Sequence, residues 1–180
     1  MEKWKLISSK YPYKSKFGNL RLDRVQLPNG NIIEEYNVME YTDWVNCVAV
    51  TREGKLLIEK QYRHGSGDFS YEVPAGTPED GEDPTDTMIR ELREETGYSS
   101  PHPPVLLGCY HTNPARNNNR MWIYLFTDCE RTDGVELDDT EEIEVGEWTF
   151  DEAERAIEDG RITHQTTVVA IERARRKLGI

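Results

Sequence analysis

The stretch GTPEDGEDPTDTMIRELREETGY, residues 76–98, does most to decide the fold of this chain. Its second half predicts a helix over residues 84–96. Asp83 suits the N-cap, Pro84 suits the first helical position, and Gly97 suits the position just after the helix. Both ends of the helix are therefore marked in the sequence.

The predicted helix has an apolar side and an acidic side. The apolar residues Met88, Ile89 and Leu92 are expected to face the core, and Thr87, Glu91, Glu94 and Glu95 to share another face. Glu91 and Glu95 repel each other at i, i+4, and the last turn disfavours anions. Two interpretations are open: a solvated acidic face relieved by Arg90, or an oxygen-rich site for a hard divalent cation.

The surrounding residues favour the second interpretation. Seven of them match the pattern G-x5-E-x7-R-E-U-x-E-E-x-G-U, in which U is a bulky apolar residue: Gly76, Glu82, Arg90, Glu91, Glu94, Glu95 and Gly97. This pattern resembles the Nudix box. Leu92 fills the first U position, whereas Tyr98 stands at the second, where an aliphatic residue is usual. The resemblance implies an α+β fold, a Nudix-type α/β/α sandwich with a mixed β-sheet, together with an N-terminal β-hairpin region.

The resemblance also implies a metal site. Nudix enzymes hydrolyse a nucleoside diphosphate linked to another moiety, with divalent metals that polarise the pyrophosphate and activate water. Mg²⁺ is the expected ion, with Mn²⁺ as an alternative. By position in the motif, Glu91 and Glu95 are metal ligands, Glu94 is a further ligand or positions water, and the Ala75 carbonyl is a candidate additional ligand.

Two more residues of the box have implied roles. Arg90 would orient the glutamates through charge-assisted hydrogen bonds. Glu82 either reaches the metals through water or is only a loop carboxylate near the start of the helix.

Outside the box, the resemblance narrows to the ADP-ribose and nucleotide-sugar pyrophosphatase branch. Gln61-Tyr62-Arg63 and Glu72-Val73-Pro74-Ala75-Gly76 match its Q-[YF]-R and E-[LVF]-P-A-G motifs, and Pro114 lies 16 residues after Tyr98. Arg63 would then contact substrate phosphates, unless it is a surface residue at a strand end. Glu72 would bind the terminal ribose or the metal shell, or have a structural role.

The segment Asn113-Pro114-Ala115-Arg116-Asn117-Asn118-Asn119-Arg120 departs from the branch, where S-P-G is common. Arg116 and Arg120 either recognise a different sugar or phosphate or belong to a polar surface loop. Aromatic faces for the base are expected in the N-terminal region, from Trp4, Tyr36, Tyr41 and Trp44. Trp44 could instead be a core residue.

The general base is expected in the acidic segment of residues 138–144. Glu141 is the first choice and Glu142 the second, because a loop carboxylate can swing toward the reacting water. The alternative is a merely solvated acidic loop. His111 is expected to be structural.

Composition limits the classes of partner. The chain has 180 residues, a net charge of −12 and a pI near 4.8, so its field repels nucleic acids and anionic membranes. Its three widely spaced cysteines fit neither a disulfide framework nor a zinc site, which favours a reducing, cytoplasmic location. Neither a signal peptide nor a membrane span is predicted.

The remaining segments predict strands followed by a few helices. Hairpins are expected over residues 20–38, around Asn29-Gly30, and over 44–62. Further strands are expected at 68–73, 105–110, 121–126 and 144–150, and helices at 151–159 and 164–178. Residues 1–40 are interpreted as an N-terminal strand region for dimerisation and substrate contact, and residues 41–180 as the Nudix domain.

The expected reaction is hydrolysis of a nucleoside diphosphate sugar, ADP-ribose first, to a nucleoside monophosphate and a sugar phosphate, by a homodimer. GDP-sugars, UDP-sugars and NADH are alternative substrates. Two rival classes are a sensor that binds nucleotide-sugars without hydrolysis and a plain acidic structural domain. The intact set of Glu91, Glu94 and Glu95 argues against the sensor, because a binder has no need of clustered charge.

Overall fold

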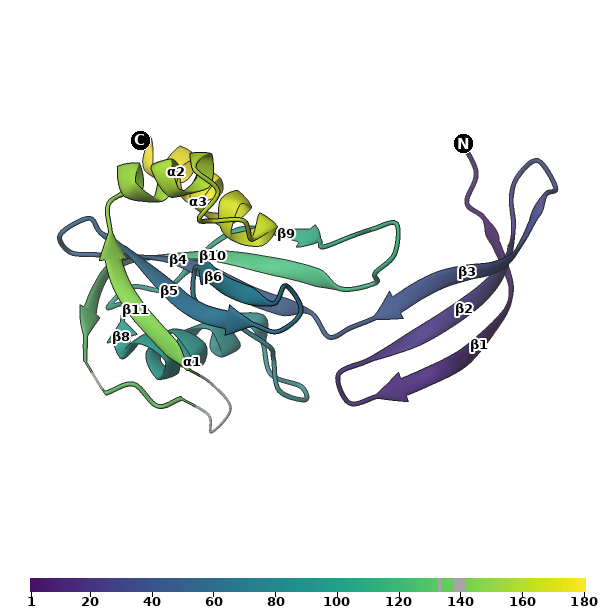
Figure 1. Cartoon of the computed structure of the whole chain (residues 1–180), viewed down its shortest axis with the longest axis horizontal. Helices are drawn as coiled ribbons and strands as arrows, with labels where there is room; N and C mark the ends of the chain where they lie inside the picture. Colours follow the sequence, from purple (N-terminus) through teal and green to yellow (C-terminus); the bar gives the residue numbers. More distant parts are fainter. Residues whose placement is uncertain (133, 138–141) are drawn as a thin grey trace. The chain divides into compact units, whose positions relative to one another are not determined.

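A computed structural model describes residues 1–132, 134–137 and 142–180 (Figure 1). The chain forms two compact units. The small unit contains Met1–Asp43 and Tyr110–Arg120, and the large unit contains Trp44–Cys109 and Met121–Ile180.

The small unit is built on a three-stranded antiparallel sheet in the order β1-β2-β3. The strands are β1 (Lys5–Ser15), β2 (Gly18–Gln26) and β3 (Ile32–Glu40). The predicted hairpin corresponds to β2 and β3. Strand β1 is not evident in the sequence, because it contains Pro12, which cannot donate to a strand ladder. The structure accommodates Pro12 where the register shifts between Lys10 and Tyr13.

The large unit has a mixed sheet whose main path runs β11-β5-β4-β10-β8. Strand β4 is buried from its second residue to its last, as expected for a central strand. It pairs parallel with β10 and antiparallel with β5. The remaining strands, β6, β7 and β9, pair with β5, β4 and β10, respectively. The strands are β4 (Trp44–Thr51), β5 (Leu56–Arg63), β6 (Asp68–Glu72), β7 (Ala75–Gly76), β8 (Tyr98–Ser99), β9 (Val105–His111), β10 (Arg120–Arg131) and β11 (Ile143–Trp148).

Helices cover both faces of this sheet (Figure 1). α1 (Pro84–Thr96) buries Met88 and Leu92 in a core on one face, and α2 (Phe150–Glu158) and α3 (Gln165–Leu178) complete a larger core on the other. The α/β/α sandwich with a mixed sheet is thereby confirmed. Among the described residues, no helix has the length and apolar character that crossing a membrane requires.

The boundaries of α1 are as predicted. The Asp83 side chain accepts a hydrogen bond from the Thr85 N–H, and Gly97 adopts a left-handed conformation with φ of 74°. The expectation that Ile89 faces the core is wrong, since this side chain is 46% exposed. The buried stripe follows Met88, Leu92 and Glu95 at i, i+4 and i+7, which leaves Ile89 at its edge.

Candidate active site

The strand that precedes α1 meets the helix at Gly76. A Cβ atom on Gly76 would lie 2.1 Å from Cδ of Glu91, so no larger residue fits without displacing the glutamate. The first glycine of the box is therefore explained by a close approach, which holds the Glu91 carboxylate against the backbone of β7.

Glu95 lies one turn further along α1 and contacts the same strand. Its side chain is buried, and its Oε2 accepts a hydrogen bond from the Ala75 N–H at 3.1 Å. The prediction placed Glu95 with Thr87, Glu91 and Glu94 on a face apart from the core, whereas the structure buries Thr87 and Glu95. Glu91 and Glu95 thus both lie at the Ala75-Gly76 backbone.

Arg90 holds the remaining carboxylates of the box. Its Nε and Nη2 donate to Glu82 at 3.1 and 3.0 Å, and its Nη1 donates to Glu94 at 2.9 Å and lies 3.0 Å from Glu91. The hydrogen bond from Arg90 lowers the pKa of Glu82 to about 2. The electrostatic conflict within the box is therefore relieved in part by one guanidinium.

The donors at this place suit a hard divalent cation in their chemistry. Carboxylates of Glu91, Glu94 and Glu95 and the backbone of Ala75 offer oxygen ligands, which Mg²⁺ and Mn²⁺ prefer. In the described part of the chain, no three acidic, histidine or cysteine side chains form a group arranged to hold a metal ion. Arg90 lies within ion-pair distance of Glu91 and Glu94. Because Gly76 has no side chain, the Glu91 carboxylate has room to lie against this backbone.

A cavity of about 730 Å³ lies in the large unit and is lined in part by Ala75 and Gly76. It brings together the predicted residues Trp44, Arg63, Glu72 and Ala75 with residues of the loop between α2 and α3, which the sequence motifs do not reveal. Its lining consists of Trp44, Arg63, Ser66, Asp68, Phe69, Ser70, Glu72, Ala75, Gly76, Thr77, Met121, Gly160, Arg161, Thr163 and His164.

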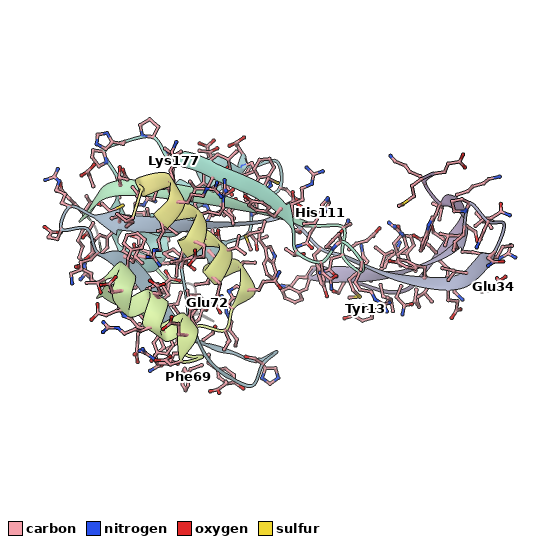
Figure 2. All side chains as sticks on the ribbon, turned by 90° about the horizontal axis from the view of Figure 1, so that it is seen from above. Tyr13, Glu34, Phe69, Glu72, His111 and Lys177 are labelled. Carbon is pink, nitrogen blue, oxygen red and sulfur yellow. The ribbon has the colours of Figure 1, made fainter. Side chains whose placement is uncertain are left out.

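Glu72 is the most buried charged group of the cavity wall, with a side chain only 3% exposed. Arg63 donates hydrogen bonds to both carboxylate oxygens of Glu72, from Nε to Oε1 at 3.0 Å and from Nη2 to Oε2 at 2.9 Å. The Nδ1 atom of His164 lies 3.1 Å from Oε2. Burial acts to raise the pKa of Glu72, but the hydrogen bonds from His164 and Arg63 outweigh it, and the pKa lies well below its usual range. Figure 2 shows Glu72 beside the end of α3 that is opposite to Lys177.

The loop between α2 and α3 contributes two residues that sequence reasoning missed, Arg161 and His164. Arg161 pairs with Asp159 at 2.8 Å and lies over the Trp148 ring at 5.6 Å. Neither belongs to a recognised motif, and the only available signal is that His164 stands at the start of a predicted helix. The structure places it at the N-cap of α3.

The other residues predicted for this unit lie as follows. Trp44 is 40% exposed and lines the cavity, so its interpretation as a core residue is wrong. Glu142 is exposed just before β11, and Glu141 lies outside the described residues.

The asparagine-rich segment belongs to the small unit and is held against β3. The Met39 N–H donates to the Arg116 carbonyl at 2.7 Å, and Tyr36 Oη donates to the Ala115 carbonyl at 2.5 Å. The side chains of Asn118 and Asn119 form hydrogen bonds with other residues of this unit. The side chains of Asn118 and Asn119 therefore have structural contacts, and Asn119 is buried rather than part of a surface loop.

Several predicted substrate contacts lie in this unit. Trp4 packs edge-on against Tyr36, with ring centroids 5.7 Å apart. Pro114, Arg116 and Arg120 are exposed on the segment, and His111, labelled in Figure 2, is exposed at the end of β9.

Comparisons with known proteins agree with these features. A model of the NUDIX domain matches residues 40–168, and a model described as the nucleoside diphosphate sugar hydrolase N-terminal domain matches residues 4–39. An ADP-ribose pyrophosphatase of Bacillus subtilis (strain 168) is 31% identical over 93% of this chain and 90% of its own length. A methanol dehydrogenase activator of Bacillus methanolicus has the same identity and coverage.

Two further matches extend the comparison. An ADP-ribose pyrophosphatase of Mycobacterium tuberculosis is 30% identical over 92% of this chain and 80% of its own length. A solved structure described as an ADP compounds hydrolase superposes with a TM-score of 0.87 over 99% of this chain and 96% of its own, at 20% identity, which shows the shared fold. The chain therefore belongs to the Nudix family and is a hydrolase.

Proposed function

We propose that this hydrolase splits the pyrophosphate bond of a nucleoside diphosphate sugar, ADP-ribose first, into a nucleoside monophosphate and a sugar phosphate. The observation that carries the proposal is the contact of Glu91 and Glu95 with the Ala75-Gly76 strand, which also lines the cavity containing Arg63. The names of two relatives as ADP-ribose pyrophosphatases support the choice of substrate.

Nudix hydrolases generally use divalent metal ions, and Mg²⁺ is the ion proposed here, with Mn²⁺ as a substitute. Glu91, Glu95 and the Ala75 carbonyl would bind the ion, and Glu94 would be a further ligand. Glu82 would hold Arg90 in position beside these glutamates. The ion supplies positive charge to the pyrophosphate, which a protein of net charge −12 otherwise repels.

The cavity residues suit the rest of the substrate. A volume of about 730 Å³ is in the range of small-molecule sites, roughly 300–1,000 Å³. Trp44 and Phe69 offer exposed aromatic faces for stacking. Arg63 is bound to Glu72 through one edge of its guanidinium, and its remaining N–H groups can donate to phosphate oxygens.

The proposed general base is a carboxylate before β11, Glu141 or Glu142, close in sequence to the strand that pairs with β5. A carboxylate at this place could take a proton from the attacking water.

The small unit is proposed to serve dimerisation and substrate contact, mainly through residues 1–40. Residues 41–180 are proposed to form the hydrolase domain. Strand β1 is exposed along nearly its whole length, including apolar Leu6, Ile7, Tyr11 and Tyr13. A second copy of the chain would cover this surface. Tyr36, Pro114, Arg116 and Arg120 are the proposed substrate contacts of this unit.

A substrate panel tests the reaction. Turnover of ADP-ribose, ADP-glucose, GDP-mannose, UDP-glucose, NADH and a diadenosine polyphosphate is followed by phosphate release with a coupled phosphatase, each with Mg²⁺, Mn²⁺ or EDTA. Metal-dependent preference for ADP-ribose is the expected result. Preference for a GDP-sugar, a UDP-sugar or NADH would correct the substrate, and binding of a nucleotide-sugar without turnover would favour a sensor.

A further inference from the structure

His164 connects α3 to the cavity wall through Glu72. Because an ionised carboxylate only accepts hydrogen bonds, the Nδ1 atom of His164, 3.1 Å from Glu72, carries the proton. Its Nε2 lies 3.2 Å from Thr166 Oγ1, and its Nδ1 also lies 3.3 Å from Thr167 Oγ1. Polar groups of Glu72, Thr166 and Thr167 therefore all lie within hydrogen-bond distance of the ring nitrogens.

A second contact joins the start of α3 to the residue directly after β6. The Val73 N–H donates to Thr167 Oγ1 at 3.4 Å, directly after Glu72 in the chain. His164 makes no side-chain capping bond to the helix, although it occupies the N-cap position. Helix capping therefore does not explain its side chain, whereas the contact with Glu72 does.

The same carboxylate determines where Arg63 points. Arg63 uses Nε and Nη2 for Glu72, its side chain remains 45% exposed, and it lines the cavity. A guanidinium held along one edge presents the other edge in a fixed direction, so less conformational entropy is lost when an anion binds.

We propose that His164 is a positioning residue for anionic substrate: it locks the Glu72 carboxylate, and Glu72 in turn aims Arg63 at a phosphate oxygen. This inference rests on the proposed function for the identity of the substrate. It assigns His164 an effect that passes through Arg63 and acts on substrate binding more than on the chemical step.

The test is a double-mutant cycle on binding of a non-hydrolysable ADP-ribose analogue, with a methylene group in place of the bridging oxygen of the pyrophosphate, measured by calorimetry with Mg²⁺ present. His164→Leu removes the donor, and His164→Asn keeps an N–H group near the position of Nδ1. Arg63→Ala removes the guanidinium. His102→Leu is the matched control, because His102 lies 3.3 Å from Asp128 and is not part of the cavity lining.

The proposal predicts that His164→Leu raises the Kd about tenfold, an effect of the size usual for coupling between residues of one hydrogen-bond network. The effect should largely disappear in the Arg63→Ala background. His164→Asn should restore most of the affinity, and His102→Leu should leave it unchanged. In turnover with Mg²⁺, His164→Leu should raise KM while kcat changes less than about threefold.

Equal effects of His164→Leu with and without Arg63 would overturn the proposal, as would an unchanged Kd or a His164→Asn variant as weak as His164→Leu. If the leucine variant does not fold, His164→Ala replaces it in the cycle. A wild type that binds ADP-ribose without hydrolysing it defeats the proposed function alone, and the cycle still decides the role of His164. A wild type that neither binds nor hydrolyses ADP-ribose overturns both the proposed function and the role of His164.

Discussion

At the scale of single residues, position 76 has the strictest steric requirement, since the structure allows only glycine there. Gly76→Ala would place a methyl group 2.1 Å from Cδ of Glu91 and push that carboxylate away from β7. Turnover should fall by roughly one to two orders of magnitude, as expected when a metal ligand is misplaced. Steady-state kinetics measure the effect. Gly65→Ala is the control, since nothing lies within 4 Å of a Cβ at Gly65, and equal losses in both variants would contradict the explanation.

Glu72 makes a residue-scale prediction about pH. Because its pKa is lowered on folding from the usual 4.5, the unfolded chain takes up the proton first as the pH falls. The stability from this carboxylate is therefore complete above pH 4.5 and is lost progressively below it. The Tm of the wild type should fall more steeply between about pH 5 and pH 3 than the Tm of Glu72→Gln. Parallel curves would contradict the lowered pKa, and exposed Glu158→Gln should follow the wild type.

The residue scale also shows where sequence reasoning ends. The box residues are predictable because the motif fixes their spacing along one helix, and Glu72 and Arg63 follow from short strand motifs. His164 could not be found this way, since its contact with Glu72 joins residues distant in sequence. The pairing of Arg90 with Glu94 is predictable because the two residues are at i and i+4 on one helix. The pairing of Arg90 with Glu82 is not, because Glu82 lies in the preceding loop.

At the scale of elements, α2 carries the loop that supplies Arg161 and His164. A capping box starts the helix: Thr149 accepts from the Glu152 N–H, and Glu152 accepts from the Thr149 N–H. Thr149→Ala should lower the free energy of unfolding by about 0.5–2 kcal/mol, measured by urea denaturation. Thr149→Asn retains a cap and should cost much less. A Thr149→Ala variant as stable as wild type would show that packing of Ala153 and Ala156 alone maintains the helix.

Elements differ in how far their sequence predicts them. α1 is marked by Asp83, Pro84 and Gly97, and both of its ends are correct. Strand β1 lacks such marks, because nearly all of it is exposed and no apolar alternation is needed. The short strands β7 and β8 depend on pairing with distant strands, which a local pattern does not encode.

At the scale of the whole molecule, the exposed β1 strand predicts self-association. Sedimentation equilibrium should give a mass of about twice 20.9 kDa. The double variant Leu6→Asp with Tyr13→Asp should shift the chain toward monomer, because charge on an exposed apolar strand opposes pairing. Ser8→Asp, a polar position of the same strand, should leave the dimer largely intact. A monomeric wild type would contradict the proposed role of residues 1–40.

The most direct test of the central claim is Mg²⁺-dependent hydrolysis of ADP-ribose by Glu95→Gln. Glutamine keeps the shape of Glu95 and can still accept from the Ala75 N–H, but it removes the negative charge that would hold the metal. Turnover should fall by roughly a hundredfold or more, while exposed Glu158→Gln behaves like the wild type. A Glu95→Gln variant with near wild-type turnover would contradict the assignment of α1 as the metal-binding helix.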